Sequence, residues 1–304
     1  HFAFVATPIN AVGISAVHTI FNLFTTALLC PFTKQLERFA NFVIRPSKKK
    51  ETYAFLDERL LGTPSIAVGE ASDMTVKMAT LARMTILSAI NICQSYDVKV
   101  ADEILKHEDE LDLYEDKLGT YLIKITSKEL TPRQTADVSK YLHTISDLER
   151  ISDHSLNIGE TAQELYTKKI VFSPTGAREL KVMLAAVTRI LEITINAFLD
   201  NDVAAAYHVE PLEELIDNLC DEMKLHHIDR LQTGECTLNH GFAFNDLLTN
   251  CERVSDHCSN IAVSLIETSA GSFDTHEYLS EVKEGGSKDY TDLYHAYTKK
   301  YALQ

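Results

Sequence analysis

The chain has 304 residues, about two domains' worth of sequence, with 45% hydrophobic and 24% charged residues. Its 44 acidic and 29 basic residues give a net charge of −15, which argues against nucleic-acid binding because phosphate backbones attract clustered Lys and Arg. Only 11 Gly and 7 Pro are present, so long helices are favoured over turn-rich folds. The 6 cysteines form no C-x-x-C pair, which favours reduced, buried thiols in a cytoplasmic setting.

The first 33 residues predict a membrane segment. Residues 11–32 carry no formal charge, and a helix of that length spans the roughly 30 Å of bilayer hydrocarbon. Basic residues follow from Lys34 to Lys50, so the positive-inside rule places the region after residue 33 in the cytoplasm. Two polar residues inside the segment, His18 and Asn22, are expected to contact either a transport path or neighbouring helices. A buried helix of a soluble bundle is the alternative for this segment.

The remainder of the chain predicts an all-α fold, because no alternating strand pattern of convincing length occurs. The expected helices span residues 73–97, 99–127, 132–168, 174–201, 203–233 and 238–269. Thr131 and Pro132, followed by Gln134, form a helix start signal. Gly285 and Gly286 indicate a linker to a short terminal helix around residues 289–301.

A ten-residue sequence occurs twice. Residues 149–158 recur as residues 252–261, displaced by 103 positions, and a fainter echo places residues 108–112 against residues 213–217. Helices therefore repeat in the same order. This pattern predicts two three-helix bundles packed together, one over residues 73–168 and one over residues 174–269.

Pairs of acidic residues one helical turn apart mark both repeats, and their carboxylates project side by side. The pairs are Glu108 with Asp112, Glu149 with Asp153, Glu213 with Asp217, and Glu252 with Asp256. Leu142 and Ile145 lie on the helix stripe of Glu149, so the acids continue an apolar ridge and are expected to face other helices. Burying carboxylates without a partner is costly, so a positive group must compensate them.

Two kinds of positive group are available. Arg150 and Arg253, each beside a motif Glu, would form structural ion pairs. Alternatively, a multivalent cation is held by carboxylates of neighbouring helices, as oxygen-rich sites hold Mg²⁺, Mn²⁺, iron or, less typically, Zn²⁺. His154 and His257 follow the motif Asp directly and point away from it, so capping or packing is expected of them rather than metal ligation.

The two repeated strings, Glu149-x-x-x-Asp153-His154-x-x-Asn157-Ile158 and its counterpart at 252–261, resemble the signature helices of PhoU domains. These are regulators of phosphate uptake made of two tandem three-helix bundles. The resemblance covers about residues 73–270. It implies one metal cluster per repeat. The acidic pairs at 108–112 and 213–217, each on the preceding helix, would contribute further ligands to these clusters. Ser152 and Ser255 depart from the family, which commonly has Gly at these positions.

The first segment carries a second resemblance. Residues 16–22, followed by Pro31-Phe32, are similar to the H-x-x-F-N helix of type II sodium/phosphate cotransporters, and residues 56–64 resemble the connector of their bacterial members. Those members place a PhoU-like domain after the transporter core. The implied organisation is an end of a membrane domain (1–33), a basic juxtamembrane segment and connector (34–72), a PhoU-like domain (73–270), and a linker with a short terminal helix (271–304).

These resemblances imply the C-terminal part of a sodium/phosphate symporter of the inner membrane, in contact with lipid, with Na⁺ and phosphate moving through a membrane core outside this chain. The cotransporter family's Gln-Ser-Ser motifs are absent from these residues, and the start at His1 favours a fragment. The expected partners are a phosphate-signalling protein or a second copy of the chain. The alternative is a stand-alone PhoU-type regulator that binds metal clusters without transport.

Two further classes of protein, an enzyme and a structural assembly, are alternatives to a transporter or a regulator. A di-metal oxidase on a helical bundle would carry Glu-x-x-His, and no Glu stands three residues before any of the 12 histidines, so the chain is not expected to be an enzyme. A purely structural coiled assembly would leave the acids solvated and would bind no metal.

Overall fold

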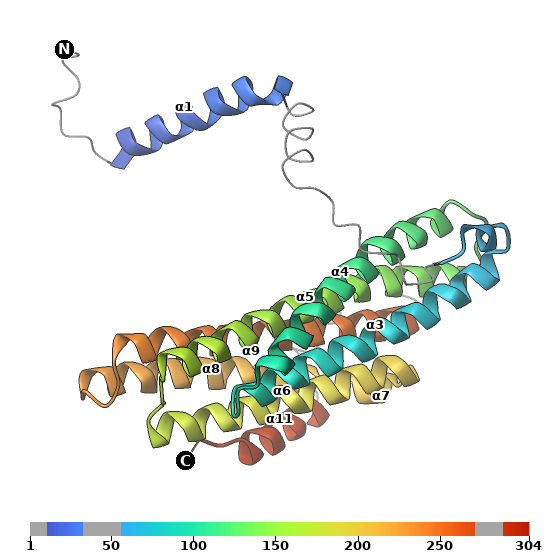
Figure 1. The fold of residues 1–304 in the computed structure, drawn as a ribbon. Helices are drawn as coiled ribbons and strands as arrows, with labels where there is room; N and C mark the ends of the chain where they lie inside the picture. The colour runs from blue at the N-terminus through green and yellow to red at the C-terminus, as the bar shows by residue number, and fades with distance from the viewer. Residues whose placement is uncertain (1–10, 33–55, 271–287, 304) are drawn as a thin grey trace, which may run out of the picture. The chain divides into compact units, whose positions relative to one another are not determined.

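The computed structural model of the chain describes residues 11–32, 56–270 and 288–303 (Figure 1). The chain divides into two units, His1–Ala54 and Phe55–Gln304. Every regular element in the described ranges is a helix, so the predicted all-α class is confirmed. The expected linker, and all of the segment at 34–50 that carries the basic residues, lie outside the described residues.

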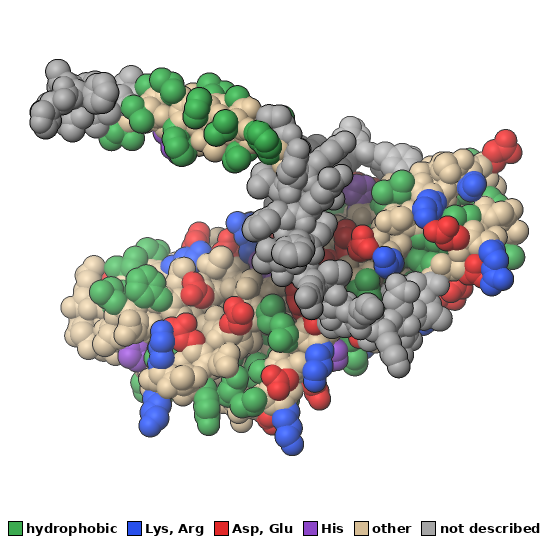
Figure 2. All heavy atoms as spheres, turned by 45° about the horizontal axis from the view of Figure 1, so that its top comes forward, with side chains coloured by type: hydrophobic (Ala, Val, Ile, Leu, Met, Phe, Trp, Pro, Cys, Tyr) green, Lys and Arg blue, Asp and Glu red, His purple; other side chains and the backbone are tan. Residues whose placement is uncertain are grey.

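The first unit contains helix α1 (Ala11–Leu29) and the short 3₁₀-helix η2 (Cys30–Phe32). The α-helix stops before Pro31, whose ring nitrogen has no hydrogen to donate. Large hydrophobic side chains such as Ile20 and Phe24 are exposed on α1. Figure 2 shows hydrophobic side chains along this helix. The Asn22 amide and the His18 ring, one turn apart, form a hydrogen bond of 2.9 Å between Nδ2 and Nε2.

The first bundle of the second unit consists of α3 (Pro64–Ile92), α4 (Val98–Thr126) and α5 (Pro132–Lys168), preceded by the 3₁₀-helix η3 (Glu58–Gly62). Local sequence explains these bounds. Thr131 and Gln134 form the expected capping box at the start of α5, and Lys169 ends that helix with a left-handed backbone. Helix α3 begins at Pro64, within the expected connector, because proline favours the first turn of a helix.

The second bundle consists of α6 (Pro174–Asp200), α8 (Glu210–Gln232) and α9 (Leu238–Ala270), with a short α7 (Val203–Ala206). The single helix expected over residues 203–233 is wrong, because the chain turns at residues 207–209 and starts again beside Pro211. Among the described helices, only α6 is long and apolar enough to cross a membrane, and 61% of its apolar window is buried inside the protein. Helix α1 contains a shorter apolar stretch, Ile14–Leu29.

The two bundles join chiefly along α5 and α9, which lie side by side (Figure 1). His154 contacts Asn250, whereas Asp147 contacts His257, so residue numbers rise on one helix as they fall on the other and the helices are antiparallel. The core includes fully buried residues on both helices, among them Leu148, Ile151, Val254 and Cys258. The expected fold of two packed three-helix bundles is confirmed.

Helix α11 (Lys288–Lys300) follows the undescribed linker and packs against α8. The Tyr290 hydroxyl donates a hydrogen bond to the Glu214 carboxylate, and the Asn218 amide donates to the Tyr294 hydroxyl at 3.2 Å.

Candidate metal centres

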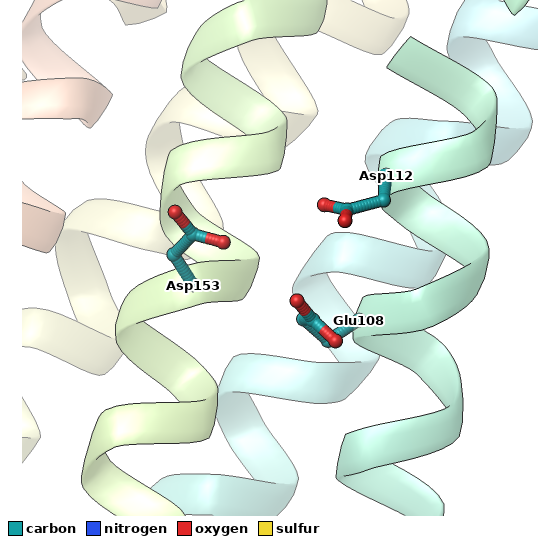
Figure 3. Close-up of side chains that lie close together, drawn as sticks. All are labelled: Glu108, Asp112 and Asp153. Carbon is teal, nitrogen blue, oxygen red and sulfur yellow. The ribbon is translucent and has the colours of Figure 1, made fainter. Parts of the chain in front are cut away.

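The first group of acids lies between α4 and α5. Glu108 and Asp112, one turn apart on α4, point toward α5, and Asp153 points back toward them (Figure 3). One oxygen atom of each carboxylate lies within 4.8 Å of an oxygen of each of the others. We call these three residues triad one.

The second group repeats this arrangement between α8 and α9. Glu213 and Asp217 on α8 face Asp256 on α9, and their carboxylate oxygens also lie within 4.8 Å of one another. We call these residues triad two. Glu213 is only 9% exposed, so this triad is the more deeply set at that position. Six of the eight acids expected from the sequence are therefore brought together, three in each repeat.

Charge accumulates in triad one. Burial, reinforced by the neighbouring carboxylates of Asp153 and Asp109, raises the pKa of Asp112 above its ordinary value. Two unit charges 4 Å apart repel by about 1 kcal/mol in water and about 4 kcal/mol near a protein surface. A bound cation would reverse the sign of this interaction.

The arginines beside the motif Glu residues do form ion pairs, as one sequence hypothesis held. Arg150 Nη1 lies 3.2 Å from Asp153 Oδ2, and Arg253 Nη1 lies 3.0 Å from Asp256 Oδ2. Both arginine side chains are more than half exposed, and exposed ion pairs contribute about 0 to 1 kcal/mol. Each triad also contains two carboxylates on the facing helix, so it holds three acidic groups beside the one arginine of these ion pairs.

Glu149, the seventh expected ligand, lies outside triad one. It is one turn from Asp153, its side chain is 19% exposed, and Arg150 Nε lies 3.5 Å from its Oε2. Burial and the nearby Asp153 carboxylate raise the pKa of Glu149 to about 7. The charges of Asp153 and Asp112 therefore act on the Glu149 carboxyl group, although its oxygens are not part of the triad one cluster.

Glu252, the eighth expected ligand, contacts other groups instead. Lys224 Nζ lies 3.2 Å from its Oε2, and the Cys220 thiol donates to the same oxygen at 3.1 Å. Burial alone would raise the pKa of Glu252, but these two hydrogen bonds lower it below its ordinary value. Sequence reasoning missed Cys220 and Lys224, although both continue the helix stripe of Asp217 along α8.

The motif histidines link the two repeats, in agreement with the packing role expected for them. His154 Nδ1 lies 2.9 Å from Asn250 Oδ1, and His257 Nδ1 lies 2.9 Å from Asp147 Oδ1. Asp147 and Asn250 were also missed. Their signal was present in the sequence, because the same displacement of 103 relates them to each other as relates the two histidines.

The donor set of both triads fits a hard cation. All three donors are carboxylate oxygens, which Mg²⁺, Mn²⁺ and iron accept readily, and no nitrogen or sulfur donor joins either oxygen cluster in the described part of the chain. Such an ion would supply positive charge between α4 and α5 and between α8 and α9.

Comparison with known proteins identifies the family of the chain. The chain matches the PhoU domain model over residues 75–162 and 180–265, which contain triad one and triad two respectively. It is 25% identical over 211 residues to the phosphate-specific transport system accessory protein PhoU homolog 1 of Thermotoga maritima, covering 69% of this chain and 89% of the relative. A PhoU homolog from Aquifex aeolicus is 23% identical over 218 residues, covering 71% of this chain and 96% of that relative.

Solved structures share the fold. PhoU from Pseudomonas aeruginosa superposes with a TM-score of 0.64 at 18% identity, over 68% of this chain and 99% of that one. The phosphate transport system regulatory protein PhoU from Streptococcus pneumoniae gives a TM-score of 0.60 at 18% identity, over 69% and 99% of the two chains. Because the matched segments cover more than half of its residues and contain both triads, the chain belongs to the PhoU domain family.

Proposed function

We propose that the second unit is a regulatory accessory domain of phosphate uptake that holds one metal centre in each of its two repeats. The relatives named above are accessory or regulatory proteins of phosphate transport, which supports a regulatory role rather than catalysis. Its partner is a protein of the uptake or signalling machinery, or a second copy of the chain. Of the two functions considered from sequence, the comparisons favour the stand-alone regulator.

The observation that carries the proposal is the repetition of the triads. Three carboxylates within 4.8 Å occur between equivalent helices of both bundles, at positions related by the internal repeat. The donor sets also match, with one Glu and two Asp in each triad. Glu108, Asp112 and Asp153 would hold one centre, and Glu213, Asp217 and Asp256 the other, with iron, Mn²⁺, Mg²⁺ or Zn²⁺ as the ion.

Elemental analysis of the chain purified without chelator tests this proposal. The wild type should retain metal, and a variant combining Asp112→Asn, Asp153→Asn, Asp217→Asn and Asp256→Asn should retain almost none. Asp116→Asn is the matched control, because Asp116 is an exposed acid of α4 outside both triads. An equally low metal content in all three proteins would contradict the proposal.

A second candidate function comes from α1. This helix of 19 residues exposes hydrophobic side chains and carries no charged residue, as a membrane-associated helix does. Under this alternative the first unit is the end of a sodium/phosphate cotransporter of the inner membrane, the second unit is its cytoplasmic regulator, and His18 and Asn22 lie near the transport path.

Two measurements separate the alternatives. A membrane-embedded protein stays in the membrane fraction after a high-salt wash, whereas a peripheral regulator is released. Phosphate uptake into vesicles containing the complete gene product should depend on Na⁺ if the cotransporter alternative holds, and equal uptake with Na⁺ and K⁺ would exclude it.

A further inference from the structure

The two triads are equivalent, but the positions next to them are not. Continuing one and two turns along the stripe that carries Glu108 and Asp112, α4 presents Glu115 and Gly119. The equivalent positions of α8, displaced by 105, are Cys220 and Lys224. Repeat two therefore has a thiol and an ammonium group where repeat one has a carboxylate and no side chain.

In repeat two, this difference determines the contacts of the motif Glu. Lys224 Nζ and the Cys220 thiol both bond to Glu252 Oε2, at 3.2 and 3.1 Å. Lys224 also approaches Asp221 within 4.0 Å, but that carboxylate is 84% exposed, so Glu252 is its main partner. Cys220 is 1% exposed, so its thiol is shielded from solvent beside the Glu252 carboxylate. Glu252 is thus held and neutralised from α8.

In repeat one, α4 offers the motif Glu no cation. Gly119 stands at the position of Lys224, and the charges that act on Glu149 from α4 are the carboxylates of Asp112 and Glu115. Among the described residues, the positive partner of Glu149 is its own neighbour Arg150, whose side chain is 57% exposed. Glu149 therefore lies beside triad one with nothing from the facing helix to compensate it.

We infer that the two metal centres are unequal, because Lys224 withdraws Glu252 from the second centre while Glu149 is available as a fourth carboxylate to the first. The inference rests on the proposed function. The first centre is the tighter one and favours ions of higher charge. The second is the weaker one, whose occupancy varies with metal concentration. Lys224 determines the metal specificity of the second centre, because its ammonium group supplies to Glu252 positive charge that the ion would otherwise supply.

Space permits the exchange of these side chains between repeats. A Cβ atom built on Gly119 would meet Ile145 Cδ1 at 3.6 Å, an ordinary van der Waals distance. The first side-chain carbon of a lysine at position 119 therefore fits beside α5, and Lys224 contacts its motif Glu from the equivalent position of α8. Reciprocal variants can thus test the role of the ammonium group in both repeats.

Titration of the metal-free chain with Mn²⁺, followed by calorimetry, tests the inference. Wild type should show a tight and a weak class of sites that differ in Kd by about tenfold or more, since carboxylate count tunes the affinity of such sites. Asp112→Asn with Asp153→Asn should remove the tight class, and Asp217→Asn with Asp256→Asn should remove the weak one.

The decisive variants are Lys224→Met and Gly119→Lys. Lys224→Met removes the ammonium group but keeps most of the stem, and it should tighten the weak class toward the affinity of the tight one. Gly119→Lys should weaken the tight class by about tenfold, because it gives Glu149 the partner that Glu252 has. Lys168→Met is the control, because Lys168 is an exposed lysine of α5 that forms an ion pair with Glu164, and neither residue belongs to a triad.

The outcomes distinguish this inference from the proposed function. If wild type binds no Mn²⁺ at either triad, the proposed function fails. If both triads bind Mn²⁺ with the same Kd, and neither Lys224→Met nor Gly119→Lys changes it beyond the control, the inference is overturned while the proposed function stands. If Lys224→Met does not fold, as judged by its circular dichroism, the affinity change in Gly119→Lys decides alone.

Discussion

His154 of α5 and His257 of α9 stack with their ring centroids 5.6 Å apart where the two repeats meet. Each ring is hydrogen-bonded by a side chain of the opposite helix, His154 by Asn250 and His257 by Asp147. The arrangement is close to twofold symmetric, with an amide on one side and a carboxylate on the other. Burial lowers the pKa of His154, which favours the neutral form of this ring at the interface between α5 and α9.

Asp147 is the acceptor for two side chains of α9, because it accepts from the Asn260 amide at 3.1 Å as well as pairing with His257. Asp147→Ala should lower the free energy of unfolding by about 1 to 3 kcal/mol, because the partly buried His257 ring and the exposed Asn260 amide both lose their acceptor. Asp147→Asn supplies an amide oxygen, as Asn250 does opposite, and should recover much of this loss. Urea denaturation measures both, and equal losses in the two variants would contradict the assignment.

Glu149 should make stability depend on pH when metal is removed by chelator. Its pKa rises from 4.5 to about 7 on folding, so the folded chain binds this proton more tightly than the unfolded chain does. Wild type should therefore lose stability relative to Glu149→Gln as the pH rises from about 4.5 to about 7, and the difference should level off above that range. A difference that stays constant from pH 4 to pH 8 would refute this behaviour.

Lys140 connects the repeats at another point. Although it is only 4% exposed, its Nζ donates to Asn201 Oδ1 at 2.8 Å, at the residue that ends α6 in a left-handed conformation. Lys140→Ala should destabilise the fold by about 1 to 3 kcal/mol, because it removes the packed methylenes of a buried side chain together with its hydrogen bond to Asn201. Lys140→Met keeps the stem and should cost less. Unchanged thermal unfolding of Lys140→Ala would argue against this role.

Helix α11 should detach more readily when its tyrosine hydroxyls are removed. Tyr290→Phe combined with Tyr294→Phe deletes the bonds to Glu214 and Asn218 described above, so amide hydrogen exchange within residues 288–300 should accelerate. Tyr166→Phe serves as the control, because Tyr166 stacks on Tyr96 through its ring, which Phe preserves. Identical protection of residues 288–300 in both proteins would mean that the hydroxyls do not hold α11.

Local signals made much of this fold predictable. The capping box of Thr131 with Gln134 gave the start of α5, and the repeated decapeptide gave the pairing of equivalent helices. The break at residues 207–209 was not expected, because Pro211 alone is compatible with a continuing helix bend or with a new start. Deciding between them depends on how α7 packs, which is tertiary information.

The candidate site was predictable to the level of helix faces and no further. Spacing placed Glu252 and Asp256 on one face of a helix, but it did not say which residues of α8 would meet each of them. Lys224 is 28 positions away from Glu252, and their contact depends on the axial position and rotation of α8 against α9. Sequence periodicity leaves these quantities undetermined.

Anomalous scattering from crystals grown with Mn²⁺ tests the central claim most directly, because it locates each ion. The account expects one peak among Glu108, Asp112 and Asp153 and another among Glu213, Asp217 and Asp256, with the first stronger at limiting Mn²⁺. A map in which Mn²⁺ occupies neither carboxylate cluster at saturating concentration would contradict it.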